Sequence, residues 1–187
     1  PFATEVDLCA AFIAEIGEAW TAYAETAGWD ILLVRKADGF QIGIQAKLKL
    51  NTHVIGQALE QYSSWVANHA GPDCRAVLVT ESDSGGFGSI CDYIGLVIIM
   101  MRTPGKVPYY HSSNFRPALP GEMYCREDDW HEWGHSKRHA LPEYVPDVAA
   151  GASAPLQLTQ WKIASLKIAV TIERRGFVTR DDFKHLG

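Results

Sequence analysis

The chain has 187 residues with 47% hydrophobic, 21% charged and 11% aromatic content, which describes a globular protein rather than a disordered one. Its formal net charge of −5 argues against a strongly basic, non-specific nucleic-acid coat. No apolar stretch approaches the roughly 20 residues that cross a bilayer. The four cysteines are widely spaced, which indicates reduced core thiols rather than a disulfide framework. We therefore expect a cytoplasmic protein with no membrane partner.

The first predicted helix covers residues 4 to 18. Thr4 is its N-cap, and Asp7 stands three positions further on, as in a capping box. At roughly 100° per residue, Glu5 borders the apolar side of this helix, so its carboxylate could reach a neighbouring sheet. A first-turn acid favoured by the helix dipole explains Glu5 equally well. The apolar side is formed by Phe2, Val6, Cys9, Ile13, Ile16 and Trp20.

A strand near Trp20 to Ala24 precedes a predicted β-hairpin that spans residues 29 to 48. The dipeptide Asp38-Gly39 separates two apolar runs and is among the strongest short-range hairpin signals. With a two-residue turn there, Asp30 lies directly opposite Lys47 and diagonally from Gln45.

These three polar side chains are predicted to share one face of the hairpin. Ile42, Ile44 and Ala46 alternate with Gln45 and Lys47, so a slip of one residue would bury the polar pair. An acid, an amide oxygen and an ammonium in such a small area suggest a place where a metal ion and a phosphate could meet. A surface hairpin with a cross-strand Asp–Lys pair accounts for the same residues.

The elements after the hairpin are expected to be a helix, a strand, a short helix and another strand. The first helix runs from about His53 to His69 and carries Gln57 and Gln61 one turn apart. A Gly/Ser-rich loop at 82–88 has no Gly-Lys-Ser/Thr and is therefore not a phosphate-binding loop. The strands and the short helix are expected at Asp73 to Val79, Ser89 to Ile94 and Leu96 to Met101.

The order of helix, strand, hairpin, helix and strand over residues 4 to 101 resembles the PD-(D/E)XK nuclease superfamily. The residues that carry the resemblance are Glu5 on the first helix, Asp30 on the second strand, Gln45-Ala46-Lys47 on the third, and the segment Gln57 to Tyr62. Two departures stand out. Gln45 replaces the usual acid of the third motif, and Ala27-Gly28-Trp29 precede Asp30 where many members carry Pro.

The resemblance implies a restriction-endonuclease-like α/β fold, with a mixed central sheet flanked by helices. It also implies Mg²⁺- or Mn²⁺-dependent hydrolysis of nucleic-acid phosphodiester bonds, with a DNA endonuclease as the expected activity. The metal ligands it implies are Asp30, the Gln45 side-chain oxygen, the Ala46 carbonyl and Glu5. Lys47 would orient the attacking water or stabilise charge on the phosphate. Gln57 or Gln61 would position the nucleic-acid backbone or brace the site. The alternative is a catalytically inactive nuclease-like module that binds DNA or a protein partner.

The chain is expected to contain a nuclease-like core at 1–102, a Pro/aromatic-rich extension packed on the core at 103–155, and a small C-terminal helical segment at 156–187. In the extension, His131, His135 and His139 recur at four-residue spacing near Cys125, which suggests an alternative zinc site in an interaction protein.

In the C-terminal segment, one helix is predicted from Thr159 to Arg174, with Gly176 as its stop and Thr179 opening a second helix. The pair looks like the opening of a winged-helix or helix-turn-helix unit. A small helical pair that closes the core or joins two copies into a homodimer fits the same pattern.

Overall fold

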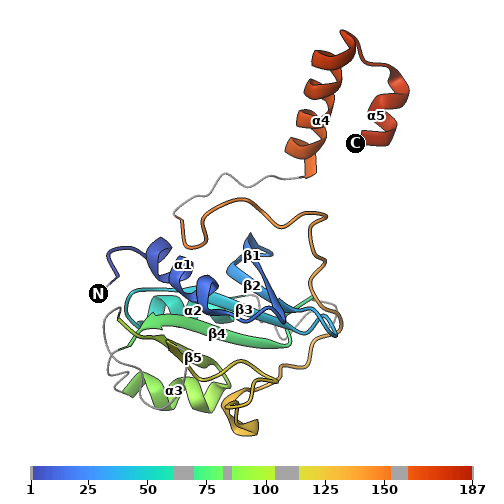
Figure 1. Cartoon of the computed structure of the whole chain (residues 1–187). Coiled ribbons are helices and arrows are strands. Elements are labelled where there is room, and N and C mark those ends of the chain that lie inside the picture. The colour runs from blue at the N-terminus through green and yellow to red at the C-terminus, as the bar shows by residue number, and fades with distance from the viewer. Residues whose placement is uncertain (1, 61–69, 82–85, 104–113, 153–159, 187) are drawn as a thin grey trace. The chain divides into compact units, whose positions relative to one another are not determined.

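The structure is a computed structural model that describes residues 2–60, 70–81, 86–103, 114–152 and 160–186 (Figure 1). The chain divides into two compact units, Pro1–Pro155 and Leu156–Gly187. Among the described residues, no helix is long and apolar enough to span a membrane.

A six-stranded mixed sheet forms the centre of the described part of the first unit, which confirms the predicted α/β class. The strands lie side by side in chain order. The pairs β3–β4 and β4–β5 are parallel, and the others are antiparallel. β3 is buried along its whole length, as expected for a central strand covered on both faces. The strands are β1 (Trp20–Thr26), β2 (Trp29–Arg35), β3 (Gln41–Ala46), β4 (Cys74–Thr80), β5 (Val97–Met101) and β6 (Phe115–Arg116), the last of which was not predicted.

Helices cover both faces of this sheet, with α1 (Glu5–Glu15) on one side and α2 (Thr52–Leu59) and α3 (Gly86–Ile94) on the other (Figure 1). One core cluster joins α1 to the α1-facing side chains of the strands, and a second joins α2 and α3 to the opposite side chains. The first includes Leu8, Cys9, Phe12, Ile31, Leu33, Ile42, Ile44 and Ala46. The second includes Trp29, Leu32, Val34, Val54, Ile55, Ala58 and Cys91.

The predicted capping box at the start of α1 is confirmed. The Asp7 N–H donates to Thr4 Oγ1 at 3.1 Å, and the Thr4 N–H donates to Asp7 Oδ2 at 3.0 Å. The helix ends at Glu15 rather than residue 18, because Ile16 already has an extended backbone (ψ 137°). Its fully buried residues are Leu8, Cys9 and Phe12. Of the predicted apolar side, Cys9 and Trp20 are buried in the core, and Phe2, Ile13 and Ile16 pack against it partly buried.

The predicted two-residue turn in the β2–β3 hairpin is wrong. The Arg35 N–H donates to the Phe40 carbonyl at 2.8 Å, which leaves a four-residue loop at 36–39. The reason is Asp38, whose carboxylate accepts from Arg35 Nε at 2.9 Å, from Arg35 Nη2 at 2.7 Å and from the Phe40 N–H at 3.1 Å. The register is shifted by two residues, which keeps the faces of the paired residues from Ile31 to Val34 and from Gln41 to Ile44 and removes the predicted pairing of Asp30 with Lys47.

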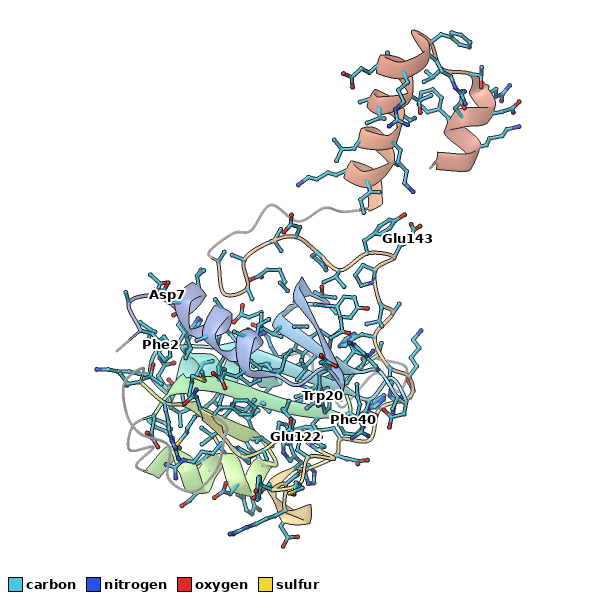
Figure 2. All side chains as sticks on the ribbon, in the orientation of Figure 1. Phe2, Asp7, Trp20, Phe40, Glu122 and Glu143 are labelled. Carbon is cyan, nitrogen blue, oxygen red and sulfur yellow. The ribbon has the colours of Figure 1, made fainter. Side chains whose placement is uncertain are left out.

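An aromatic and cationic cluster closes the loop end of this hairpin. Trp20 and Phe40 lie side by side with ring centroids 6.5 Å apart (Figure 2). The Arg35 guanidinium lies 5.6 Å from the Trp20 ring centre and 4.6 Å from that of Phe40. These contacts hold the first residue of β1, Trp20, against the hairpin.

The described part of the extension, residues 114–152, contacts the hairpin and β4. The buried Asp73 carboxylate accepts from the Gln41 N–H and from Arg138 Nε, each at 2.7 Å. The Gln41 side-chain amide forms two hydrogen bonds with the His139 backbone, at 2.9 and 3.0 Å. This segment also contains the 3-10 turn η1 (Glu127–Asp129).

The second unit consists of α4 (Gln160–Arg175) and α5 (Arg180–Leu186). The predicted stop is confirmed: Gly176 has φ +79°, and its N–H donates to the Ile172 carbonyl at 2.7 Å. Thr179 caps α5, as predicted. The proposed cap of α4, Thr159, lies outside the described residues. Between Lys162 and Lys184 no residue is buried.

Candidate active site

An opening between β2 and β3 brings Asp30 to Ala46. Backbone pairing of the two strands ends at Ile31 and Ile44. Beyond that pair, the Ala46 N–H donates to Asp30 Oδ2 at 2.7 Å, so a carboxylate stands where a strand carbonyl would otherwise accept. Because the N–H and C=O of one strand residue point to the same side, the Ala46 carbonyl faces the same opening.

A break in the alternation of β2 directs Asp30 toward α1. Trp29 packs with the second cluster, although regular alternation would place it beside Ile31 in the first. Gly43 makes this possible, because a Cβ there would lie only 2.4 to 2.7 Å from three atoms of the Trp29 ring. Trp29 Nε1 donates to His139 Nε2 at 3.3 Å, which fixes the ring and with it the residue before Asp30.

Glu5 and Lys47 form an ion pair beside this opening. Lys47 follows the last residue of β3, and its Nζ lies 2.9 Å from Glu5 Oε1 and 3.1 Å from Oε2. The two side chains are 29% and 31% exposed, so solvent reaches the pair. The structure therefore brings together Glu5, Asp30, Ala46 and Lys47 from three elements of the first unit.

The electrostatics of the opening are dominated by carboxylates. Burial, with the charge of Glu5 adding to it, raises the pKa of Asp30 above its usual value, although the Ala46 N–H and Lys47 oppose the shift. Burial raises the pKa of the Cys9 thiol beneath them to about 12, with further contributions from Asp30, Glu25 and Glu5. Three acidic groups, Glu5, Glu25 and Asp30, thus influence one another at this opening, and the Lys47 ammonium lies beside them.

Glu25 is the acid of this group that the sequence analysis missed. Ala27 (φ +56°) and Gly28 (φ +82°) form a two-residue turn between Thr26 and Trp29. Glu25 (φ +47°) lies between the partners of Trp29 and Ile31, beside the part of β2 that carries Asp30. Burial and the charge of Asp30 raise the pKa of Glu25, whose Oε1 accepts from the Gly151 N–H at 2.8 Å. The signal was present in the sequence, because Ala27-Gly28 separates two strands by two residues.

The prediction that Gln45 shares a face with Lys47 is wrong. Gln45 follows Gly43 in the alternation and so lies on the Trp29 side of β3, and its Nε2 donates to the Gly28 carbonyl at 2.7 Å. Lys47 instead reaches Glu5 on the α1 side. The cause is the end of β3 at Ala46, after which the regular alternation no longer applies.

The two predicted glutamines of the following helix are not part of this gathering. Gln57 is half-buried on α2, which covers the face of the sheet opposite α1. Gln61 lies outside the described residues.

The alternative zinc site is not formed. Within the part of the chain that the structure describes, no group of three or more His, Cys, Asp or Glu side chains is arranged to hold a metal ion. His135 Nε2 instead lies 3.7 Å from Asp73 Oδ1, and His139 accepts from Trp29. The same finding means that a cation at the Asp30 opening would also need carbonyl or amide ligands.

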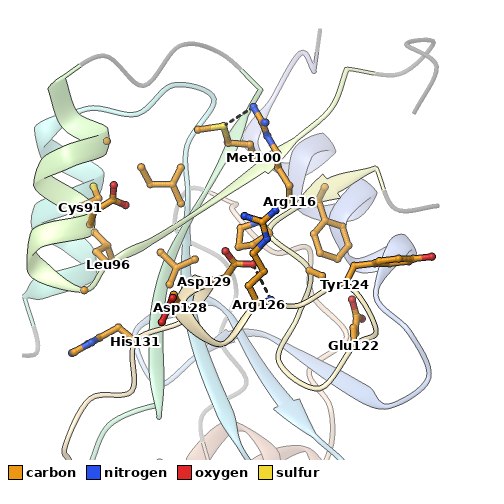
Figure 3. A pocket seen from close by; sticks show the side chains of 18 of the residues that line it. Cys91, Leu96, Met100, Arg116, Glu122, Tyr124, Arg126, Asp128, Asp129 and His131 are labelled. Atoms are coloured by element: carbon orange, nitrogen blue, oxygen red, sulfur yellow. Dashed lines mark hydrogen bonds between the residues drawn. The ribbon is translucent and has the colours of Figure 1, made fainter. Parts of the chain in front are cut away.

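A separate cavity of about 900 Å³ lies between α3, β5 and the segment around η1 (Figure 3). Arg116 and Arg126 project into its middle, and Asp128 and Asp129 lie close by. Arg102 also lines it, and its Nη1 is buried with no hydrogen-bond partner among the described residues. None of the residues at the Asp30 opening lines this cavity, so it is distinct from the candidate site.

Comparisons of the chain with protein-family models, with curated proteins and with solved structures find no match.

Proposed function

We propose that this chain is a restriction-endonuclease-like protein of the PD-(D/E)XK superfamily that hydrolyses nucleic-acid phosphodiester bonds, with DNA as the expected substrate. One observation carries the proposal. The Asp30 carboxylate occupies the opening between β2 and β3, bonded to the Ala46 N–H and next to the Glu5–Lys47 pair. The element order α1, β1, β2, β3, α2, β4 is also the order on which the resemblance rests.

The oxygen atoms at this opening suit a hard divalent cation such as Mg²⁺ or Mn²⁺. The residues that would hold it are Asp30 and Ala46 (through its carbonyl), with Glu5 as a further ligand. Gln45 is no longer among them, because it lies on the Trp29 side of β3. Burial is the main cause of the raised pKa values of Asp30 and Glu25, and a neighbouring carboxylate adds to each. A cation held beside them would favour their ionised forms. When bound, such an ion polarises the scissile phosphate and lowers the pKa of a water ligand.

The remaining chemistry belongs to side chains already in place. Lys47 lies at the mouth of the opening, where its ammonium can donate to a phosphate oxygen as negative charge develops there. Glu5 holds this ammonium in position until a phosphate competes for it. Trp29, fixed over Gly43, keeps the backbone before Asp30 rigid and so limits the positions of the carboxylate.

The test compares cleavage of plasmid and linear DNA by the parent and by Asp30→Ala and Lys47→Ala, with Mg²⁺ or Mn²⁺ supplied. Loss of the principal carboxylate or of the charge-stabilising lysine is expected to slow cleavage about 10²- to 10³-fold. Asp92→Ala and Lys36→Ala are matched controls, since both side chains are exposed and lie outside the site. Cleavage that survives both site substitutions would reject the assignment.

An inactive module that binds DNA or a protein partner is the second candidate function. It is favoured by Gln45, which stands where the superfamily carries an acid and whose amide donates to the Gly28 carbonyl on the Trp29 side of β3. Calorimetric titration with Mn²⁺ separates the two candidates. The nuclease should bind the ion in a manner abolished by Asp30→Ala, whereas the inactive module should release no binding heat that depends on Asp30.

A further inference from the structure

The second unit differs in charge from the rest of the chain. Its 32 residues contain six Lys or Arg and three Asp or Glu, a net charge of +3, whereas the first 155 residues carry eleven and nineteen, a net charge of −8. A polyanion would therefore be repelled by the first unit as a whole and attracted by the second.

All three arginines of this unit lie at the turn between α4 and α5, together with its three acids, Glu173, Asp181 and Asp182. Asp182 pairs with Arg175 and Asp181 with Lys184, so Arg174 and Arg180 are offset there by Glu173 alone. Arg174 and Arg175 end α4, Arg180 begins α5, and all three are exposed. Arg175 Nη1 lies 3.1 Å from Asp182 Oδ1, but no ion pair joins Arg174 or Arg180 to another residue that the structure describes. Phe177, between the arginines, is 62% exposed.

Helix stability explains only part of this arrangement. Cations at the end of α4 are favoured by the helix dipole, but Arg180 lies at the positive end of α5, where a cation is unfavourable. An exposed phenyl ring likewise contributes little to folding. Phe177 is the most exposed of the large apolar side chains that the described part of this unit exposes, which are Leu166, Val170, Ile172, Phe177 and Phe183. Arg180 is unfavourable for α5, and the Phe177 ring adds little to stability, at the same turn. This combination is expected of a binding surface.

Hydrogen bonds within the turn stabilise its backbone conformation. The Asp182 carboxylate accepts from the Thr179 N–H at 2.9 Å and from Thr179 Oγ1 at 2.7 Å. Gly176 closes α4 through its bond to Ile172. Such a turn presents its arginines without a large cost for ordering them on binding.

We infer that the α4–α5 turn binds single-stranded nucleic acid, with Arg174 and Arg180 on phosphates and Phe177 stacked on an unpaired base. Arginine is the residue best suited to phosphate oxygens, and an exposed aromatic ring stacks on any base. The inference rests on the nucleic-acid substrate proposed above and names a second place where the chain contacts it.

The experiment measures fluorescence anisotropy of a fluorescein-labelled single-stranded DNA with the full chain in EDTA, between 50 and 200 mM salt. Substituting Arg174→Gln and Arg180→Gln together should lower the slope of log K against log salt by about 1.4, at about 0.7 for each phosphate contact. If the parent and the arginine variant bind equally at 1 M salt, this difference in slope makes the variant bind about 25-fold more weakly at 0.1 M salt. Phe177→Ala should weaken binding about fivefold or more and leave the slope unchanged.

A charge-matched control is Lys36→Gln with Lys137→Gln, two exposed lysines of the first unit, which should leave the slope unchanged. Parent that fails to bind, or an unchanged slope in the arginine variant, would overturn the inference. A dimer formed through α4 would also overturn it. In that case Leu166→Lys, which places a charge on the exposed side of α4, would dissociate the dimer, and the arginine variant would bind DNA like the parent.

The two proposals fail separately in this design. EDTA removes any metal-dependent cleavage, so Asp30→Ala should bind with the slope of the parent whether or not the chain is an enzyme. A lower slope in the arginine variant without cleavage by the parent would reject only the nuclease. Cleavage that depends on Asp30 with an unchanged slope would reject only the turn.

Discussion

Gly43 is the position at which a single added methyl group should do most harm to this fold. Its Cα lies under the Trp29 ring, and a Cβ there would be 2.4, 2.5 and 2.7 Å from three ring atoms. The backbone of Gly43 is not in the left-handed region, so alanine is excluded by space and not by conformation. Gly43→Ala must therefore displace the Trp29 ring, which is only 2% exposed.

The cost can be estimated from the contacts that the ring would lose. Overpacking of a core by one methyl group costs about 1 to 3 kcal/mol. A displaced ring also weakens the hydrogen bond from Trp29 Nε1 to His139 Nε2, which is worth about 1 kcal/mol. We expect the free energy of unfolding to fall by about 3 kcal/mol. At about 2 kcal/mol per M in urea, the midpoint should fall by about 1.5 M.

The assay is urea unfolding followed by far-ultraviolet circular dichroism, with Gly56→Ala as the matched control. Gly56 is an exposed position inside α2, and a Cβ there meets no atom within 4 Å. Alanine should raise the midpoint at Gly56, because it is favoured over glycine in helices by about 1 kcal/mol. The same Gly-to-Ala change is thus expected to have opposite effects at the two sites.

A second background identifies the Trp29 ring as the cause. In Trp29→Leu the space above Gly43 is larger, so adding Gly43→Ala should cost less than about 1 kcal/mol. A midpoint for Gly43→Ala equal to that of the parent, or an equal cost with and without the Trp29 ring, would refute the reasoning.

Three further predictions concern charge. Because burial and Glu5 raise the pKa of Asp30, the ionised form of Asp30 opposes folding. Asp30→Asn should therefore be more stable than the parent at pH 7, and the difference should vanish below about pH 3.9. Equal urea midpoints of the two proteins at pH 7 would contradict this. Lys47→Met should lower stability by no more than about 1 kcal/mol in thermal unfolding, since the Glu5–Lys47 pair is partly exposed. It should also raise the pKa of Asp30 further, as measured by a carboxyl NMR titration. An unchanged pKa of Asp30 would count against the proximity of Lys47 and Asp30. Burial and Arg75 lower the pKa of His139, so the parent should lose stability as the pH falls below about 6.5 toward that lowered pKa. His139→Gln keeps an acceptor for Trp29 and should lose less stability over the same pH range. Equal losses in the two proteins would exclude His139 as the cause.

Local sequence signals predicted most elements of the first unit. The capping box of Thr4 and Asp7 acts over three residues and needs no tertiary partner, so it fixed the start of α1 correctly. Continuous apolar runs likewise marked β4 and β5; β4 is buried on both faces, whereas buried and half-buried residues alternate along β5. The two-residue strand β6 carried no comparable signal, because it is defined by its pairing with β5.

The candidate site was predicted only in part. The sequence brought Asp30 and Lys47 to neighbouring strands, but it placed them in a register set by a two-residue turn. The side chain of Asp38 widened that loop, and the packing of Trp29 on Gly43 reversed the local alternation before Asp30. Glu25 joined the group through the hairpin between β1 and β2.

The sequence by itself determined the order of the helices and of strands β1 to β5, the caps of α1 and α5, and the division of charge between an acidic first unit and a basic second one. These depend on interactions within a few residues or on composition alone. Only the tertiary structure decided which acids stand together at the opening, because that depends on where β2 and β3 part and on which side of the sheet a large ring can find space. Both are outcomes of packing between residues far apart in the chain.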